Sequence, residues 1–287
     1  MTHARLRRRL APAGVLLLLA ATAAIDACGC AGGGLGTAAG TFTPRTPGTL
    51  TVATAQVPDP GFWTGTIAHP SGGFEYELAR SLAARFGLAH VRVIEVPFDR
   101  LITGHLGGAD LALSDITATT ERARHVAFSV GYLDAPPAIL VRPGTSVPDV
   151  HTAQRLRWAV QVHTTLQQVL AEEIEPSRPA LILAHQREVL AALRSGRAQA
   201  VMLDLPVALA YARESPHTYA VAAQLSSNED ELAAALPHGS GENLEAVDSA
   251  LRALSSDGTI ERLGHTWLHT DLQDGRAEQV PLLRTEE

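Results

Sequence analysis

Polar side chains that could hold charged groups follow several of the strands that the sequence predicts. Arg122 stands after the loop 115–121, at an expected helix start. Its planar guanidinium could bind a carboxylate through two parallel hydrogen bonds. A plainer interpretation is a capped helix start, Thr119-x-x-Arg122, with the arginine solvated on the surface. The residues alone favour this second interpretation.

Two threonines and a histidine occupy the turn after the predicted strand 156–162. Thr164 and Thr165 directly precede an expected helix, so backbone N–H groups at this turn could face an anion. His163 stands just before them, either as a ligand contact or as an exposed turn residue, and the second role is more common.

Two aspartates occupy comparable positions. Asp204 follows the predicted strand 198–203, and its carboxylate could pair with a cation or act as the N-cap of a helix that begins near Pro206. Asp115 lies in the loop before Thr117. It could add a second anion to a binding site or be a solvated loop residue, and both interpretations stay open.

Composition excludes several classes of protein. The 287 residues carry a formal net charge of −7, which argues against a nucleic-acid binder because phosphates require a basic face. The two cysteines are too few for a disulfide framework or a cysteine-rich zinc site. No G-x-S-x-G, P-loop or G-x-G-x-x-G motif is present, and we expect no cofactor and no metal site.

The elements that position these side chains are strands and helices that alternate along the sequence. This alternation indicates an α/β fold with a largely parallel sheet. The pattern restarts after residues 138–141, which suggests two lobes. The expected strands are 50–54, 90–96, 109–113, 156–162, 180–183, 198–203 and 230–236, and the expected helices are 74–87, 100–107, 165–173, 187–195, 243–255 and 260–268.

The N-terminal segment is typical of an exported protein. Four arginines precede a short apolar stretch and then small residues, which predicts a signal peptide over 1–27. The following residues resemble a bacterial lipobox, so we expect a lipid anchor on Cys28, with Cys30 as the alternative. Residues 28–47 are rich in Gly, Thr, Ala and Pro and predict a flexible tether.

Five fragments carry a resemblance to a known family, and they occur in that family's order: GGFEYELARSLAARFG, DLALSDITATTERARHVAFSVGY, RWAVQVHTT, LRSGRAQAVMLDLPVALAY and LRALSSDGTIERLGHTWL. The chain resembles the type II extracellular solute-binding proteins of family 3, the amino-acid-binding components of ABC importers. The match runs from about residue 48 to residue 269.

The resemblance implies a two-lobed, Venus-flytrap fold whose lobes are joined by two hinge strands. The hinges would fall near residues 136–140 and 228–232. The first lobe would comprise 48–137 and 231–270, and the second lobe 138–230. Residues 271–287 would form a mobile tail.

It also implies roles for the charged residues. Arg122 aligns with the arginine that clamps the ligand carboxylate, Thr117 with a hydroxyl donor, and Asp204 with the acidic residue that pairs with the ligand ammonium. Two positions depart from the family. His163 replaces a usual glycine beside Thr164 and Thr165, and Asp115 replaces a small residue and could favour a cationic ligand side chain.

Aromatic walls are expected around the ligand's aliphatic part. Phe98 aligns with one wall, although it could instead belong to the core. Phe62 or Trp63, in a first loop that diverges from the family, could form the other. Glu75 replaces the family's usual aspartate and is expected to have a structural role at a helix start.

The function that the resemblance implies is capture of an amino acid and its delivery to ABC permease subunits. The protein would be a monomer, anchored by lipid on the extracytoplasmic face of the cell membrane, and not an enzyme. An enzyme on the same fold, such as a dehydratase with Asp115 as general acid, is one alternative. A sensory ligand-binding module is another.

Overall fold

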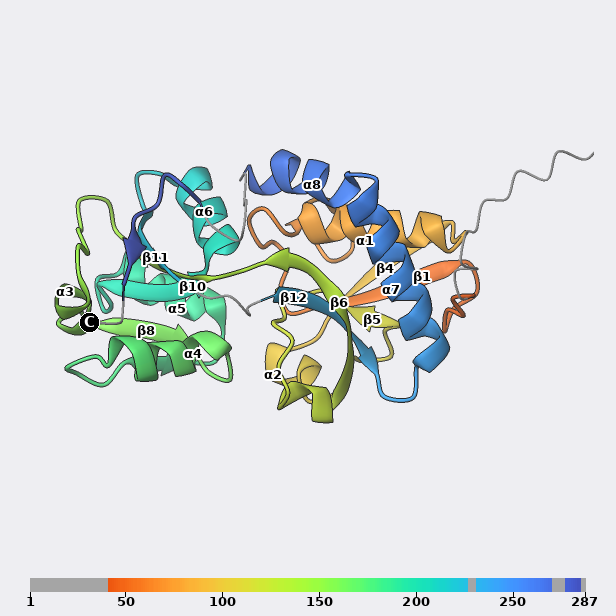
Figure 1. Ribbon diagram of the computed structural model, residues 1–287, viewed down its shortest axis with the longest axis horizontal. Helices are drawn as coiled ribbons and strands as arrows, with labels where there is room; N and C mark the ends of the chain where they lie inside the picture. Colours follow the sequence, from red (N-terminus) through yellow and green to blue (C-terminus); the bar gives the residue numbers. More distant parts are fainter. Residues whose placement is uncertain (1–40, 227–230, 270–276, 285–287) are drawn as a thin grey trace, which may run out of the picture. The chain divides into compact units, whose positions relative to one another are not determined.

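The computed structural model describes residues 41–226, 231–269 and 277–284. Residues 38–287 belong to one compact unit, which contains two main β-sheets with helices packed on them (Figure 1). The predicted signal peptide, Cys28 and Cys30 lie outside the described residues. No helix within the described ranges combines the length and apolar character needed to cross a membrane.

The first lobe is built on a five-stranded sheet with the order β4-β1-β5-β12-β6. Strands β4, β1 and β5 are parallel, and β12 runs antiparallel to β5 and β6. The elements of this lobe are β1(Thr49–Thr54), β2(Thr64–Gly65), β3(Pro70–Gly72), α1(Phe74–Arg85), β4(His90–Glu95), α2(Phe98–Leu101), β5(Leu111–Ala112), η1(Arg122–Arg124), β6(Val126–Asp134), β12(Glu231–Pro237), α7(Gly241–Ser256), α8(Thr259–Leu263) and η3(Gly264–Leu268).

The second lobe is built on a six-stranded sheet with the order β13-β11-β7-β10-β8-β9. Strands β10, β8 and β9 are parallel, and β7 runs antiparallel to β10 and β11. The elements are β7(Pro137–Val141), α3(Val150–Gln154), β8(Trp158–Gln161), α4(Thr165–Val169), η2(Leu170–Ile174), β9(Leu181–Leu183), α5(Gln186–Arg194), β10(Ala200–Asp204), α6(Leu205–Glu214), β11(Ala220–Leu225) and β13(Leu282–Leu283).

The chain passes directly from one lobe to the other between β6 and β7, and Figure 1 shows this connection in the middle of the molecule. Ala135, at the crossing, is fully buried, and one apolar cluster continues through it from Leu78 in α1 to Leu203 in β10. The crossing is therefore packed and not a solvated linker. The return crossing, between β11 and β12, lies largely outside the described residues.

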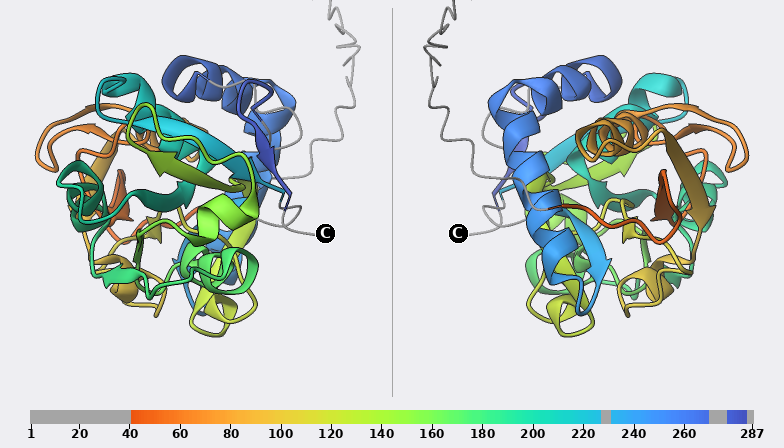
Figure 2. Two further views of the ribbon diagram at one scale, coloured as in Figure 1. Left: turned by 90° about the vertical axis from the view of Figure 1, so that its left-hand side faces the viewer. Right: turned by 90° about the vertical axis from the view of Figure 1, so that its right-hand side faces the viewer.

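Local sequence explains where the elements near the crossing begin and end. Leu78 and Leu82 recur on the buried face of α1, and Gly87, at φ 69°, ends the helix in the left-handed conformation that favours glycine. Helices α7 and α8, drawn in blue in Figure 2, contact α1. The expected helix 100–107 is shorter, since α2 ends at Leu101 before Gly104 at φ 85°.

Both ends of the described chain pack more closely than the composition predicts. Phe42, inside the expected tether, is buried and stacks on Phe86 with ring centroids 4.3 Å apart. In the expected mobile tail, residues 277–284 lie against the second lobe, where β13 pairs with β11. Val280 and Leu283 are buried there, so a few apolar side chains seat a segment whose composition is otherwise polar.

Candidate functional site

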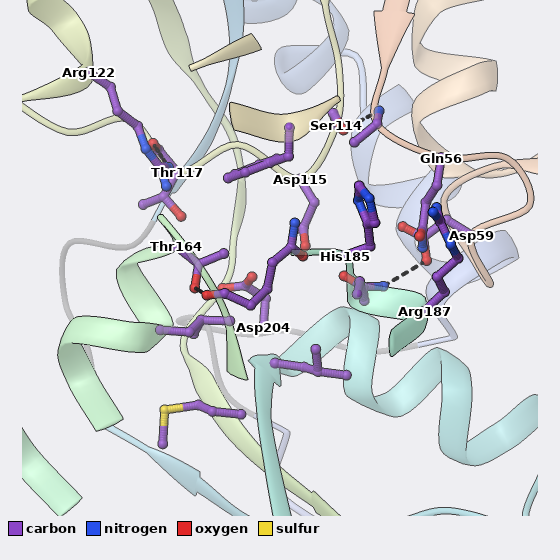
Figure 3. Close-up of a pocket in the computed structure, with 17 residues that line it drawn as sticks. Gln56, Asp59, Ser114, Asp115, Thr117, Arg122, Thr164, His185, Arg187 and Asp204 are labelled. Atoms are coloured by element: carbon purple, nitrogen blue, oxygen red, sulfur yellow. Dashed lines mark hydrogen bonds between the residues drawn. The ribbon is translucent and has the colours of Figure 1, made fainter. Parts of the chain in front are cut away.

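A cleft between the lobes contains most of the predicted site residues. Its lining comes from loops at the carboxyl ends of parallel strands, the usual location of ligand sites in α/β folds. The lining residues are Ala55, Gln56, Asp59, Phe98, Ser114, Asp115, Thr117, Arg122, Gln161, Thr164, Leu166, His185, Gln186, Arg187, Met202, Leu203 and Asp204. In Figure 3, Arg122 and Thr117 lie at one end and Asp59 at the other, with Asp115 and Asp204 between them.

The cavity within this cleft has a volume of about 50 Å³. One water molecule requires on the order of 10–15 Å³ on this measure, so the cavity has room for a few waters and not for an amino acid. A ligand of that size therefore requires the lobes to separate before it can enter.

Arg122 is a buried cation at the start of η1. Its backbone N–H donates to Thr119 Oγ1 at 3.2 Å, although the N-cap residue of η1 is Glu121 and not Thr119. The side chain is not solvated, because Nη1 donates to the Thr117 carbonyl at 2.8 Å and Nη2 to the His163 carbonyl, across the cleft, at 3.0 Å. The guanidinium carbon lies 5.3 Å from the centre of the Phe98 ring, within the range of a cation–π contact.

The turn that accepts the Arg122 hydrogen bond is held by its own side chains. Thr164 is the N-cap of α4, where its hydroxyl accepts from the Gln167 N–H at 3.2 Å and donates to the Gln161 carbonyl at 2.8 Å. His163 has a left-handed φ of 63°, at the position where the family usually has glycine. His163 and Thr165 line an outer groove, and Arg122 is also part of the lining of this groove.

Asp115 is positioned by a buried carboxyl group beneath the cleft. The Asp115 backbone N–H donates to Glu75 Oε1 at 2.8 Å, and φ at Asp115 is 52°. Glu75 also accepts from Trp63 Nε1 and from the Tyr132 hydroxyl, each at 2.6 Å. Burial raises the pKa of Glu75 to about 7 although these three hydrogen bonds oppose the shift. The structural role predicted for Glu75 is therefore to hold the loop that carries Asp115.

Asp115 and Asp204 face each other across the cleft. Burial together with the negative charge of Asp204 raises the pKa of Asp115 well above its ordinary value. Asp204 occupies the N-cap position of α6, but its side chain makes no capping hydrogen bond there. Asp204 is therefore the N-cap residue by position, as predicted, but its buried carboxyl group lines the cleft.

Trp63 does not line the cleft, which corrects the prediction of an aromatic wall in the first loop. Trp63 and Phe62 are both buried in the core of the first lobe, and the Trp63 indole is held by Glu75. Phe98 is the aromatic residue that the cleft does contain.

Sequence reasoning missed a polar cluster that joins the lobes. Asp59 accepts hydrogen bonds from Gln186 Nε2 and from the Tyr211 hydroxyl, each at 3.1 Å. Gln56 Nε2 donates to the same hydroxyl at 3.5 Å. Burial raises the pKa of Asp59 to about 6. Gln56 and Asp59 follow β1, and Gln186 follows β9. Their positions after strand ends could have identified these three residues from the sequence.

Other residues that reach the cleft were also not predicted. His185 and Arg187 are contributed by the start of α5, and Ser114 precedes Asp115. Within the described ranges, no three His, Cys, Asp or Glu side chains are grouped so as to hold a metal ion.

Two lobes that enclose a charged cleft at their interface define a ligand-binding protein of the Venus-flytrap class. The sequence profile of the bacterial extracellular solute-binding proteins, family 3, matches residues 52–270, and the chain belongs to this family. The predicted family and the predicted two-lobed fold are thus confirmed.

Its relatives include amino-acid-binding proteins. The L-cystine-binding protein TcyJ of Escherichia coli (strain K12) is 25% identical over 204 residues, which cover 70% of this chain and 75% of that protein. The solved structure of an ancestral arginine-binding protein bound to glutamine is 27% identical, has a TM-score of 0.68, and covers 78% of this chain and 99% of its own.

A similar structure is that of a binding protein described as the precursor of an enzyme. The solved structure of an ancestral amino-acid-binding protein, a precursor of cyclohexadienyl dehydratase, is 29% identical with a TM-score of 0.65. It covers 77% of this chain and 96% of its own.

Proposed function

We propose that this protein captures an amino acid between its lobes and delivers it to the permease of an ABC importer. The observation that carries the proposal is the position of Arg122, a buried cation of the first lobe that donates to the His163 carbonyl of the second. A ligand carboxylate bound there contacts both lobes at once, so ligand binding and lobe closure are coupled.

The contacts of the ligand follow from the charges of the cleft. The guanidinium of Arg122, with its fork of five N–H donors, binds the carboxylate, and the hydroxyls of Thr117 and Thr164 lie at the same end of the cleft. Asp204 binds the α-ammonium group. Phe98, stacked on Arg122, covers the aliphatic part of the ligand.

Delivery depends on two arrangements of the lobes. The small cavity requires an open form for entry, and the closed form then encloses the ligand, as in other proteins that close by hinge motion. We propose that the permease recognises the closed form. A chain held by a lipid on Cys28 at the extracytoplasmic face would remain close to that permease.

A thermal-shift screen of the full-length chain in mild detergent, against the twenty common amino acids and polyamines, tests the proposal. A true ligand stabilises the protein by about 2.7 kcal/mol at a concentration one hundred times its Kd. Calorimetry then measures Kd for the best ligand. Stabilisation by no amino acid would contradict the proposal.

Two further measurements address the anchor. A Cys28→Ala chain should lose incorporation of radiolabelled fatty acid and should be released from membranes, whereas Cys30→Ala should retain both. The reverse result would assign the lipid to Cys30.

A dehydratase is the second candidate, because the cleft contains two carboxyl groups with raised pKa values, those of Asp59 and Asp115. A general acid requires such a shift. Mass spectrometry of the ligand after prolonged incubation with the protein distinguishes the candidates. Recovery of unchanged ligand supports a binding protein, and loss of water from the ligand supports the enzyme.

A further inference from the structure

Three carboxyl groups line the cleft, and they differ in their partners. Asp59 accepts from Gln186 and Tyr211 of the second lobe. Asp115 and Asp204, by contrast, face each other (Figure 3), and Asp115 Oδ1 is buried with no hydrogen-bond partner among the described residues. An unpaired buried acceptor of this kind is costly, so it points to a group that the ligand supplies.

The facing carboxyl groups of Asp115 and Asp204 disfavour each other's ionisation. Two like charges in a buried site repel, so one of the two groups favours its protonated form when no cation is present. The charged groups that face Asp115 reinforce this state, because Asp204, Glu75 and Asp59 all disfavour its ionisation. The cations that line the same cleft are Arg122, Arg187 and, when protonated, His185.

The charges of an amino acid can be matched to this arrangement. Its carboxylate is paired with Arg122 and its α-ammonium with Asp204, which leaves Asp115 without a counter-charge. A neutral side chain would leave the proton on Asp115. A cationic side chain takes the place of that proton and supplies the counter-charge of Asp115.

We infer that the cleft selects amino acids with a cationic side chain, and that this cation pairs with Asp115 in place of a proton. The proton leaves to the solvent as the ligand enters, so one positive charge is exchanged for another. The inference rests on the proposed function and identifies its substrate class. Asp115, the departure from the family's small residue, is the specificity-determining position.

Arginine and citrulline provide a matched test, because citrulline carries a neutral urea in place of the guanidinium and has nearly the same shape. Arginine gains a charged contact with Asp115 that citrulline cannot make, so calorimetry of the full-length chain should give a Kd for arginine about 30-fold or more below that for citrulline. Asp115→Asn and Asp115→Ser should reduce this ratio to about fivefold or less. Glu245→Gln, which removes one exposed carboxylate on α7, should retain the ratio.

The exchange of charge has its own readout. Titrations at pH 6 in two buffers of different protonation enthalpy should show proton release on arginine binding and little on citrulline binding. Acidification should weaken arginine binding more than citrulline binding. Arginine binding without proton release would overturn the exchange.

The outcomes separate this inference from the proposed function. Equal or tighter binding of citrulline overturns the selectivity for cations while amino-acid capture stands. Failure of every amino acid to bind overturns the proposed function itself. The wild-type comparison is decisive even if an Asp115 variant does not fold.

Discussion

The Asp59 carboxylate of the first lobe accepts a hydrogen bond of 3.1 Å from the Tyr211 hydroxyl of the second. Gln186 Nε2, also from the second lobe, donates to the same oxygen at the same distance. Hydrogen bonds to a charged group contribute about 1.5–3 kcal/mol. This contact therefore favours the closed arrangement of the lobes before any ligand is considered.

We predict that Tyr211→Phe shifts the lobes toward the open form and weakens ligand binding by about tenfold, because closure loses one charge-assisted hydrogen bond. Calorimetry gives the change in Kd, and small-angle scattering should show a larger radius of gyration without ligand. Tyr219→Phe is the matched control, since the Tyr219 hydroxyl accepts from Arg194 within the second lobe. Equal effects of both substitutions would refute the role of the contact.

Arg122→Ala should weaken binding of the best amino acid by more than 100-fold while the fold remains intact. The buried cation that faces the carboxylate is lost, and such truncations cost about 2–5 kcal/mol. Arg122→Lys should recover little, because a lysine ammonium lacks the planar fork. Circular dichroism monitors folding, and Arg124→Ala, an exposed neighbour in η1, serves as control. Unchanged affinity in Arg122→Ala would contradict the assignment.

Glu75 should make the folded protein less stable as the pH rises from about 4.5 to about 7. Its pKa is raised to about 7 in the folded state, so the folded state holds the proton more tightly than the unfolded chain over this interval. The stability contribution is present below pH 4.5 and is lost above pH 7, and it amounts to about 3 kcal/mol.

Urea unfolding across this pH range, compared between wild type and Glu75→Gln, measures the contribution. The variant should show a smaller slope, and Asp59, whose pKa is also raised, should account for part of what remains. The Glu75→Gln variant should also be less stable than the wild type at pH 7, since one amide oxygen cannot accept all three hydrogen bonds from Trp63, Tyr132 and Asp115. If the free energy of unfolding of the wild type and of Glu75→Gln changed equally with pH, this role of Glu75 would be excluded.

Gln224→Ala should destabilise the second lobe by about 2–3 kcal/mol. The buried Gln224 amide donates to the Ala277 and Val280 carbonyls at 2.8 and 2.7 Å and accepts from the Ala277 N–H at 3.2 Å, so its removal leaves backbone groups unpaired. Chemical unfolding measures the loss. Gln199→Ala, whose exposed partner is the Arg157 N–H, should change stability much less.

Local pattern predicted most of the elements because each depends on residues close in sequence. The Leu78 and Leu82 spacing gave α1 its buried face, and the local pattern correctly placed Arg122 at a helix start, that of η1. The same local signal misjudged the Arg122 side chain. Its burial depends on the carbonyl of His163, 41 residues away.

The parts that sequence reasoning missed depend on contacts between distant residues. Asp59 and Tyr211 are separated by 152 positions, and no spacing rule connects them. Trp63 was assigned to the cleft because it stands in a loop after β1. In the structure its indole N–H finds the buried carboxylate of Glu75, a partner that composition alone does not reveal.

The short strand β13 has a practical consequence for handling the protein. It lies at the end of the second sheet beside β11, and a short terminal strand limits edge-to-edge aggregation because it shields a longer neighbour. Truncation before Ala277 would uncover β11 as an open edge. Affinity tags and fluorophores are therefore better attached beyond residue 284 than substituted for residues 277–284, which pack against the second lobe.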